Sequence, residues 1–246
     1  MRKQPSLRVG SRSMMPCMRG WWVALGMASA VLSPLYAAPA ASLDTRRVAS
    51  VSADATRLVK WVLESGDNRG LPFAIIDKKN ARLTVLSPDG TARGTTPVLL
   101  GLARGDDSVP GIGERKMADI LPEERTTPAG RFLAEHGRNA NGEDIVWIDY
   151  DAAVSMHRVR PNNKVERRLQ RLASLTAADN RISYGCVNVP AAFYDGVVVP
   201  TFVSHNAVVY VLPDVKPLRQ VFTHLSAGDS SRGSSSASSK KGPLSL

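Results

Sequence analysis

The feature that most constrains the fold is a series of short apolar segments between residues 73 and 212, alternating with a period of two and separated by turn-forming residues. Side chains two positions apart in an extended chain share one face, so this period is typical of β-strands. Many short strands with turn signals between them indicate a β-sandwich or barrel. The sequence therefore predicts a mainly β fold with a few short helices, and strands are expected at 73–77, 81–86, 96–102, 132–134, 144–149, 152–157, 196–200 and 207–212.

Two segments carry a helical pattern instead. In residues 54–65, four apolar residues can share one face of a helix, namely Leu58, Trp61, Val62 and Leu63, and Gly66 follows as a stop signal. Between His157 and Cys186, apolar residues recur at positions i, i+4, i+7 and i+8 with basic residues among them. These apolar residues are Val165, Leu169, Leu172 and Ala173. A basic helix with one apolar face is therefore expected between His157 and Cys186.

The first 38 residues have the layout of a secretory signal. Five basic residues and no acidic residue occur in them, and the apolar stretch 20–32 is followed by small residues. An uncleaved membrane anchor is the alternative, which the short apolar stretch disfavours. Loss of residues 1–38 lowers the formal charge from +10 to +5, which weakens an interpretation as a nucleic-acid-binding protein. We therefore predict export to the periplasm or cell envelope, with no stable membrane insertion after cleavage.

Composition divides the rest of the chain into three parts. Residues 39–71 are expected to form a linker and the N-terminal helix, and residues 72–213 hold the predicted strands in a single domain. Residues 214–246 are rich in serine, with nine serines in 226–246. This tail has few large apolar groups to offset the entropy of ordering, so it is expected to be disordered.

The chain has only two cysteines, Cys17 and Cys186, and Cys17 lies within the predicted signal. The mature chain would therefore carry one thiol in an oxidising compartment, with no partner for an internal disulfide. Cys186 lies in Arg-Ile-Ser-Tyr-Gly-Cys-Val-Asn at 181–188. A thiol becomes an acyl acceptor when a neighbouring base makes it a thiolate. Gly185 lets backbone approach a substrate carbonyl, so N–H groups from Tyr184 to Cys186 are candidates for an oxyanion hole. A buried, inert cysteine is the alternative.

The motif Ser-x-Gly-Cys-hydrophobic-Asn at 183–188, with an upstream strand ending in His157, resembles the catalytic domain of the L,D-transpeptidase (YkuD-type) family. A second match is Thr-Pro-x-Gly-x-Phe at 127–132, and the similarity spans roughly residues 72–212. Two departures mark a divergent member. Tyr184 stands where the family usually has His, and the spacer between His157 and Cys186 is longer by about one basic helix.

The resemblance implies roles for particular residues. Cys186 would be the nucleophile and His157 its base, oriented by a backbone carbonyl and not by a carboxylate. Three other histidines fit the family's order less well, namely His136, His205 and His224. A half-buried strand histidine without a catalytic role is the alternative for His157.

Other residues near the motif have weaker assignments. Ser183, Tyr184 and Gly185 would support the nucleophile loop or the oxyanion, and an ordinary exposed serine or a packing aromatic is the alternative. Asn188 would hold the turn after Cys186 or contact substrate. Because Arg pairs with carboxylates in a bidentate manner, Arg160 and Arg181 are candidates for binding substrate carboxylates. A solvated helix face is the alternative for the basic residues.

The implied reaction is a two-step acyl transfer on peptidoglycan stem peptides. Cys186 would form a thioester with loss of D-alanine, and an amine of another stem peptide or of an envelope protein would resolve it. If water resolves it, the enzyme is an L,D-carboxypeptidase or amidase; a non-catalytic cell-wall-binding module is a further alternative. No metal and no cofactor are expected, since Asp106 and Asp107 lack Cys or His partners at ligand spacing. The absence of interleaved aromatic and basic residues argues against a nucleic-acid partner.

Overall fold

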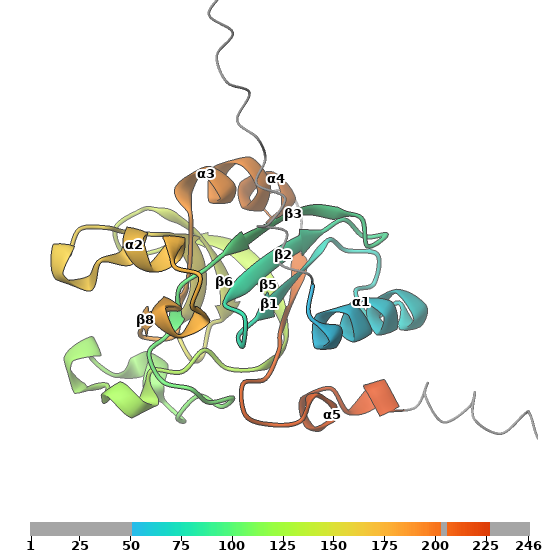
Figure 1. Cartoon of the computed structure of the whole chain (residues 1–246), viewed down its shortest axis with the longest axis horizontal. Helices are drawn as coiled ribbons and strands as arrows, with labels where there is room; N and C mark the ends of the chain where they lie inside the picture. The colour runs from blue at the N-terminus through green and yellow to red at the C-terminus, as the bar shows by residue number, and fades with distance from the viewer. Residues whose placement is uncertain (1–50, 203–205, 227–246) are drawn as a thin grey trace, which may run out of the picture. The chain divides into compact units, whose positions relative to one another are not determined.

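The structure is a computed structural model that describes residues 51–202 and 206–226 (Figure 1). The predicted signal at 1–38, the linker up to residue 50, His205 and residues 227–246 lie outside the described part. Helix α1 (Ala53–Ser65) begins at Ser52, whose hydroxyl accepts the N–H of Ala55, and ends at Gly66 with φ 67°. The predicted N-terminal helix and its stop are therefore confirmed. No helix in 51–202 or 206–226 is long and apolar enough to cross a bilayer.

Eight strands form one mixed sheet in the order β3-β2-β1-β10-β5-β6-β7-β9. The strands are β1 (Phe73–Asp77), β2 (Arg82–Leu86), β3 (Ala92–Pro97), β5 (Gly130–Arg138), β6 (Asp144–Asp149), β7 (Val154–Arg158), β9 (Val187–Val189) and β10 (Ala207–Val211). Neighbouring strands are antiparallel except for the parallel pairs β1 with β10 and β7 with β9. The predicted mainly β fold with a few short helices is confirmed.

The two edge strands of this sheet approach each other. Leu99, two residues beyond β3, forms an antiparallel bridge with Asn188 of β9, and their backbones exchange two hydrogen bonds of 2.9 Å. A short parallel pair, β4 (Leu100–Gly101) with β8 (Arg181–Ser183), continues this contact. The sheet is therefore a nearly closed barrel, and its closure brings the segment around Cys186 beside the first strands of the chain.

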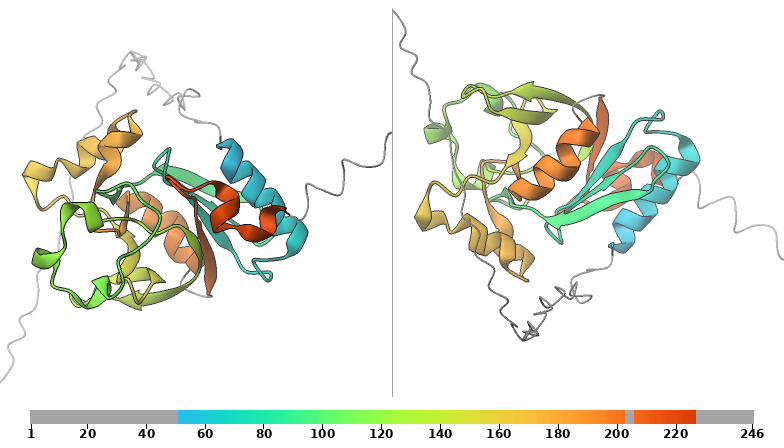
Figure 2. Two further views of the ribbon diagram at one scale, coloured as in Figure 1. Left: turned by 90° about the horizontal axis from the view of Figure 1, so that it is seen from below. Right: turned by 90° about the horizontal axis from the view of Figure 1, so that it is seen from above.

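Two apolar clusters account for the pattern of the strands. Inward side chains such as Leu83, Val146 and Val209 are fully buried inside the barrel. On the outer face of β1 and β10, Leu58 and Val62 of α1 pack in a second cluster. Figure 2 shows α1 beside α5 (Leu218–Val221), which contributes to the same cluster. Each fully buried side chain of this size contributes about 1.5–3 kcal/mol to stability, so α1 is held by tertiary packing.

The strand predicted at 196–200 is wrong. Residues 191–202 form a continuous helical segment made of α3 (Ala191–Phe193), the π-helix η7 (Tyr194–Val198) and α4 (Val199–Phe202). Tyr194, Val198 and Phe202 are spaced by four and are all buried in the interior cluster. The run Val197–Val199 favours a strand locally, but burial of a helical face outweighs that preference.

Two other segments differ in detail from their predictions. The third strand, expected at 96–102, is two pieces, because β3 ends at Pro97 and β4 begins at Leu100. The segment between His157 and Cys186 is helical, as predicted, but it consists of η5 (Lys164–Glu166), α2 (Arg168–Ala173) and η6 (Ala177–Asn180). Its predicted apolar face is wrong, since Val165 and Leu169 are 88% and 53% exposed and Leu172 is buried.

The domain extends beyond the boundary predicted at residue 213. Leu218 and Phe222 are buried in the cluster beneath α1, and η8 (Thr223–Ser226) follows them. The segment 214–226 is therefore part of the packed domain and not of a disordered tail. Residues 103–125 hold three short 3-10 turns: η2 (Ile112–Glu114), η3 (Met117–Asp119) and η4 (Pro122–Glu124).

Candidate active site

The parallel pair β7 and β9 places four polar side chains on one face. Met156 is opposite Val187 and His157 opposite Asn188, and Met156 and Val187 are buried in the barrel. Since side chains alternate along a strand, their neighbours point to the opposite face. These neighbours are Ser155 and His157 on β7, Cys186 immediately before β9, and Asn188 on β9. All four line one cavity of about 360 Å³.

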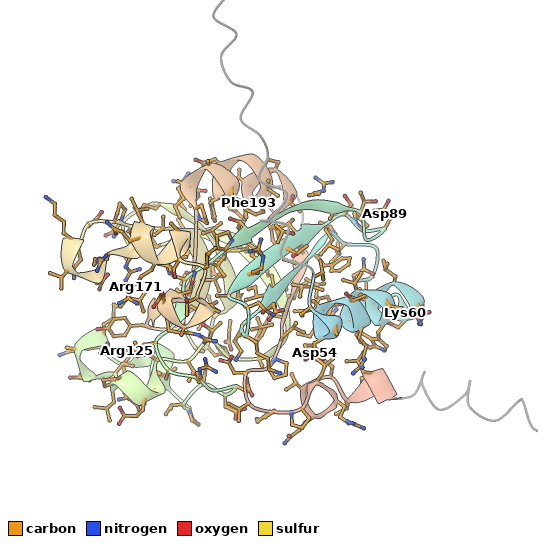
Figure 3. All side chains as sticks on the ribbon, viewed as in Figure 1. Asp54, Lys60, Asp89, Arg125, Arg171 and Phe193 are labelled. Carbon is orange, nitrogen blue, oxygen red and sulfur yellow. The ribbon has the colours of Figure 1, made fainter. Side chains whose placement is uncertain are left out.

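Three parts of the chain wall this cavity. One wall is the face of β7 and β9 together with Ser183 and Tyr184. A second wall comes from β6 and from Asn139, the residue after β5. The inserted segment forms the third wall, and Met117 of η3 completes the rim. In Figure 3, Arg171 of α2 and Arg125 after η4 lie on the side of the sheet away from Lys60 of α1. Trp147 is half-buried and lines the cavity. The cavity surface is mainly apolar with a few amide and charged groups, which is typical of a small-molecule or peptide site.

The thiol of Cys186 is partly exposed and has two contacts. Its Sγ lies 3.6 Å from Ser155 Oγ and donates to the carbonyl oxygen of Ala153 at 3.7 Å. Within the described residues, His157 is not among the hydrogen-bond partners of this sulfur. The thiol thus contacts Ser155 and Ala153 in the same cavity that His157 lines.

His157 has the features of a base. Its Nδ1 lies 2.7 Å from the carbonyl oxygen of Arg158, so Nδ1 carries the proton and Nε2 keeps its lone pair. Burial, together with the charges of Arg160 and Arg168, lowers the pKa of His157, against an opposing effect of its hydrogen bond to Arg158 and of Glu143. The imidazole is therefore neutral at neutral pH.

Ser183 organises the loop before Cys186. Its Oγ accepts the N–H of Gly185 at 3.1 Å and donates to the carbonyl oxygen of Cys186 at 2.6 Å. Gly185 has φ 133°, and a Cβ there would lie 2.7 Å from the carbonyl oxygen of Thr126. Because Ser183 Oγ accepts the N–H of Gly185, this N–H is already bonded and is not free for an oxyanion. Of the three N–H groups expected there, those of Tyr184 and Cys186 have no acceptor among the described residues.

Thr127 holds the same loop from below. Its hydroxyl donates to the carbonyl oxygen of Gly185 at 2.8 Å and accepts the N–H of Gly101 at 2.9 Å, and its side chain is buried. Its own carbonyl accepts from Lys78 Nζ at 2.7 Å. Sequence reasoning identified the Thr-Pro-x-Gly-x-Phe segment but gave Thr127 no role, because its partners are 26 and 58 residues away.

The two candidate carboxylate-binding arginines have different positions. Arg160 lines the cavity, where it is paired with Glu143. Arg181 does not line it: its guanidinium is buried and donates to Asp214 at 2.8 Å and to the carbonyl of Lys78 at 2.7 Å. The assignment of Arg181 to substrate binding is therefore wrong, because its charge is used to hold β8 to the segment after β10.

Asn188 and Tyr184 both line the cavity. Asn188 is fully buried, and its Nδ2 donates to the carbonyl oxygen of Cys186 at 3.2 Å. It therefore holds the turn after the nucleophile, which was one of the two roles expected. The ring of Tyr184 lies 4.0 Å below the guanidinium carbon of Arg125, so a cation–π contact fixes it.

Asp106 has a structural environment. Burial alone raises its pKa, but hydrogen bonds from the backbone of Lys216, from Lys78 and from the backbone of Asp214 and Val215 lower it to about 2. Across the described residues no group of three or more His, Cys, Asp or Glu side chains is arranged to hold a metal. His136 is exposed on β5, and neither it nor His224 lines the cavity.

No known protein family and no curated protein matches this chain by sequence. Among solved structures, the chain is similar to the catalytic domain of an L,D-transpeptidase from E. faecium, with 17% identity, a TM-score of 0.34, and coverage of 58% of this chain and 98% of that one. It is also similar to the helical cell shape determining protein Pgp2 from Campylobacter jejuni, with 15% identity, a TM-score of 0.40, and coverage of 71% and 62%.

A third structure is L,D-transpeptidase 1 of Mycobacterium tuberculosis, with 16% identity, a TM-score of 0.33, and coverage of 57% and 61%. The chain thus spans less than two thirds of the length of the last two proteins. It has structural similarity to L,D-transpeptidase catalytic domains at low sequence identity. Similarity at these identities and TM-scores does not identify an activity or a substrate.

Proposed function

We propose that this protein is an exported cysteine acyltransferase, with Cys186 as nucleophile and His157 as base. One observation carries the proposal: strand β7 presents an imidazole, and the residue immediately before the parallel strand β9 presents a thiol, on the same face of one cavity. The lowered pKa of His157 supports it, because a base must be neutral at the working pH.

In the proposed first step, Cys186 Sγ leaves Ser155 and Ala153 and gives its proton to His157 Nε2. The thiolate attacks the carbonyl carbon of an amide, and a tetrahedral oxyanion forms beside the N–H groups of Tyr184 and Cys186. The C–N bond then breaks, the imidazolium returns its proton to the leaving amine, and a thioester remains on Cys186. A second amine, or water, attacks the thioester by the reverse sequence.

The substrate class we propose is the peptidoglycan stem peptide, cleaved between an L-centre and a D-residue. The resemblance of residues 126–132 and 183–188 to the L,D-transpeptidase motifs favours this class. The cavity supports it in a general way, because Arg160 and the amides of Asn162 and Asn163 can bind the carboxylates and peptide groups of such a chain. Transfer to another stem peptide gives a cross-link, whereas transfer to water makes the protein a carboxypeptidase or amidase.

A second candidate is a non-catalytic cell-wall-binding module. It is favoured by the contacts of the thiol, which in this structure are with Ser155 and Ala153 and not with the imidazole. Labelling with iodoacetamide at neutral pH separates the two: an activated Cys186 reacts faster than a free thiol such as glutathione, and an inert one reacts more slowly.

The decisive experiment uses mass spectrometry of the protein with a purified tetrapeptide stem. The enzyme is expected to form a covalent adduct and release D-alanine, and both signals disappear in C186A. The variant H157Q loses most of the rate, whereas H136Q, which removes an exposed imidazole outside the cavity, retains it. An intact, folded wild-type protein that gives neither adduct nor D-alanine would overturn the proposal. Addition of an amine acceptor then distinguishes transfer from hydrolysis.

A further inference from the structure

Arg168 is the first residue of α2, in the segment inserted between His157 and Cys186. The chain enters the helix through Arg167, which has φ 52°. The side chain of Arg168 lines the cavity and is 15% exposed, unlike the exposed neighbours Lys164 and Arg167. The inserted segment, which contributes no strand to the barrel, therefore supplies a guanidinium to the cavity.

Two contacts fix this guanidinium. Its Nε donates to the carboxylate of Glu166, and its Nη1 donates to Oδ1 of Asn188. Asn188 is fully buried and donates through Nδ2 to the carbonyl oxygen of Cys186 at 3.2 Å. Arg168 thus donates to Asn188, and Asn188 in turn donates to the backbone of Cys186.

The direction of these hydrogen bonds determines the orientation of the Asn188 amide. With Oδ1 facing a guanidinium, the NH₂ group has to face the carbonyl of Cys186. In the flipped amide, Oδ1 would face that carbonyl and the NH₂ group would face Arg168, so both hydrogen bonds would become repulsive contacts. A hydrogen bond to a charged donor is about twice as strong as one between neutral groups, so Arg168 strongly selects one orientation.

We propose that Arg168 is a positioning residue that acts through Asn188 to hold the Cys186 backbone for acyl transfer, so that the inserted segment completes the active site. This inference rests on the proposed function of Cys186. The same guanidinium also lies within electrostatic range of His157, whose pKa it lowers. The other charges that affect His157 are Arg160 and Glu143, which are paired with each other.

The test uses p-nitrophenyl acetate, which acylates a thiol and releases p-nitrophenol without any requirement for peptide recognition. The rate of C186A is subtracted from every measurement, which removes reactions at Cys17 and at surface lysines. On the plateau of the pH profile, R168M is expected to acylate about tenfold more slowly than wild type. Tenfold corresponds to ~1.4 kcal/mol, which is just below the range for loss of a hydrogen bond to a charged group. K164M removes the same charge from the same segment, but Lys164 is exposed and does not line the cavity, so this variant should react at the wild-type rate.

The pH profile separates positioning from a general loss of structure. R168M removes a positive charge near His157, so the acid limb of the profile should move to higher pH. R168K keeps the charge but loses the planar fork, so it should lower the plateau and leave the acid limb in place. R168K also keeps the test available if R168M does not fold.

A double-mutant cycle with N188A tests the route of the effect. If Arg168 acts through Asn188, the two losses are not additive, and R168M slows N188A by less than twofold. The inference is overturned if R168M reacts like K164M, or if the effects of R168M and N188A multiply. Wild-type protein that acylates with p-nitrophenyl acetate but releases no D-alanine from the stem peptide would refute the proposed substrate and leave the role of Arg168 standing.

Discussion

The hydroxyl of Thr127 offers the sharpest test of how the nucleophile loop is held. It is 1% exposed and joins three segments, accepting the N–H of Gly101 and donating to the carbonyl of Gly185. The variant T127V keeps the shape of the side chain and deletes the hydroxyl. Because both partner groups belong to buried glycines, water does not replace the lost hydrogen bonds.

The expected loss follows from these two orphaned groups. An unsatisfied buried donor or acceptor costs ~1–3 kcal/mol, and the near-isosteric change adds no cavity. T127V should therefore lower the free energy of unfolding by about 2–6 kcal/mol. With an m-value of roughly 2 kcal/mol/M in urea for a domain of this size, the unfolding midpoint should fall by about 1–3 M.

Equilibrium unfolding in urea, followed by tryptophan fluorescence, measures this loss. T127S keeps the hydroxyl and should stay within about 1 kcal/mol of wild type. T84V makes the same chemical change at the exposed pair Thr84 and Thr95, whose hydroxyls are 3.1 Å apart, and should cost less than about 0.5 kcal/mol. If T127V is no less stable than T84V, the hydroxyl does not hold the loop and the reasoning fails.

Three further predictions follow from the same geometry. G185A should destabilise the protein by more than about 3 kcal/mol in urea unfolding, since its Cβ would lie 2.7 Å from the carbonyl oxygen of Thr126. The control G142A, at φ 77° with open space around it, should cost only about 1 kcal/mol. Equal losses in the two variants would contradict this prediction. The pKa of Asp106 is about 2 in the fold against 3.8 ordinarily, so its carboxylate contributes about 2 kcal/mol above pH 3.8 that disappears as the pH falls toward 2. The stability difference between wild type and D106N should shrink over that interval, and a constant difference would refute the assignment. Because burial lowers the pKa of His157 from its ordinary 6.5, the midpoint of the acid limb of the acylation rate should lie below pH 6.5. A midpoint above pH 6.5 would contradict a buried neutral imidazole.

Local patterns in the sequence predicted the elements that depend on local preferences. The period of two located most strands of the barrel, and the helix from Ala53 to Ser65 with its glycine stop follows from its amphipathic spacing. The order of His157 and Cys186, with Gly185 between them, identified the two groups that the fold brings to one cavity. Their chemical roles remain predictions for the experiments described above.

Tertiary contacts decided what local patterns do not encode. The segment around Val197 has strand-forming residues, yet it is helical because Tyr194 and Phe202 are buried in the barrel. Arg181 lies two residues before Ser183 and appears in sequence to flank the site, but its charge partner is Asp214, 33 residues away.

The sequence by itself determined that this chain is mainly β, and that one thiol and one imidazole lie on either side of a basic segment. Only the tertiary structure placed the hydroxyl of Thr127 against the loop of that thiol and the guanidinium of Arg168 against Asn188. The reason is physical, because the alternation of apolar residues is a property of each strand. A hydrogen bond, in contrast, forms with whichever distant backbone or side-chain group the nearly closed barrel brings within 3 Å.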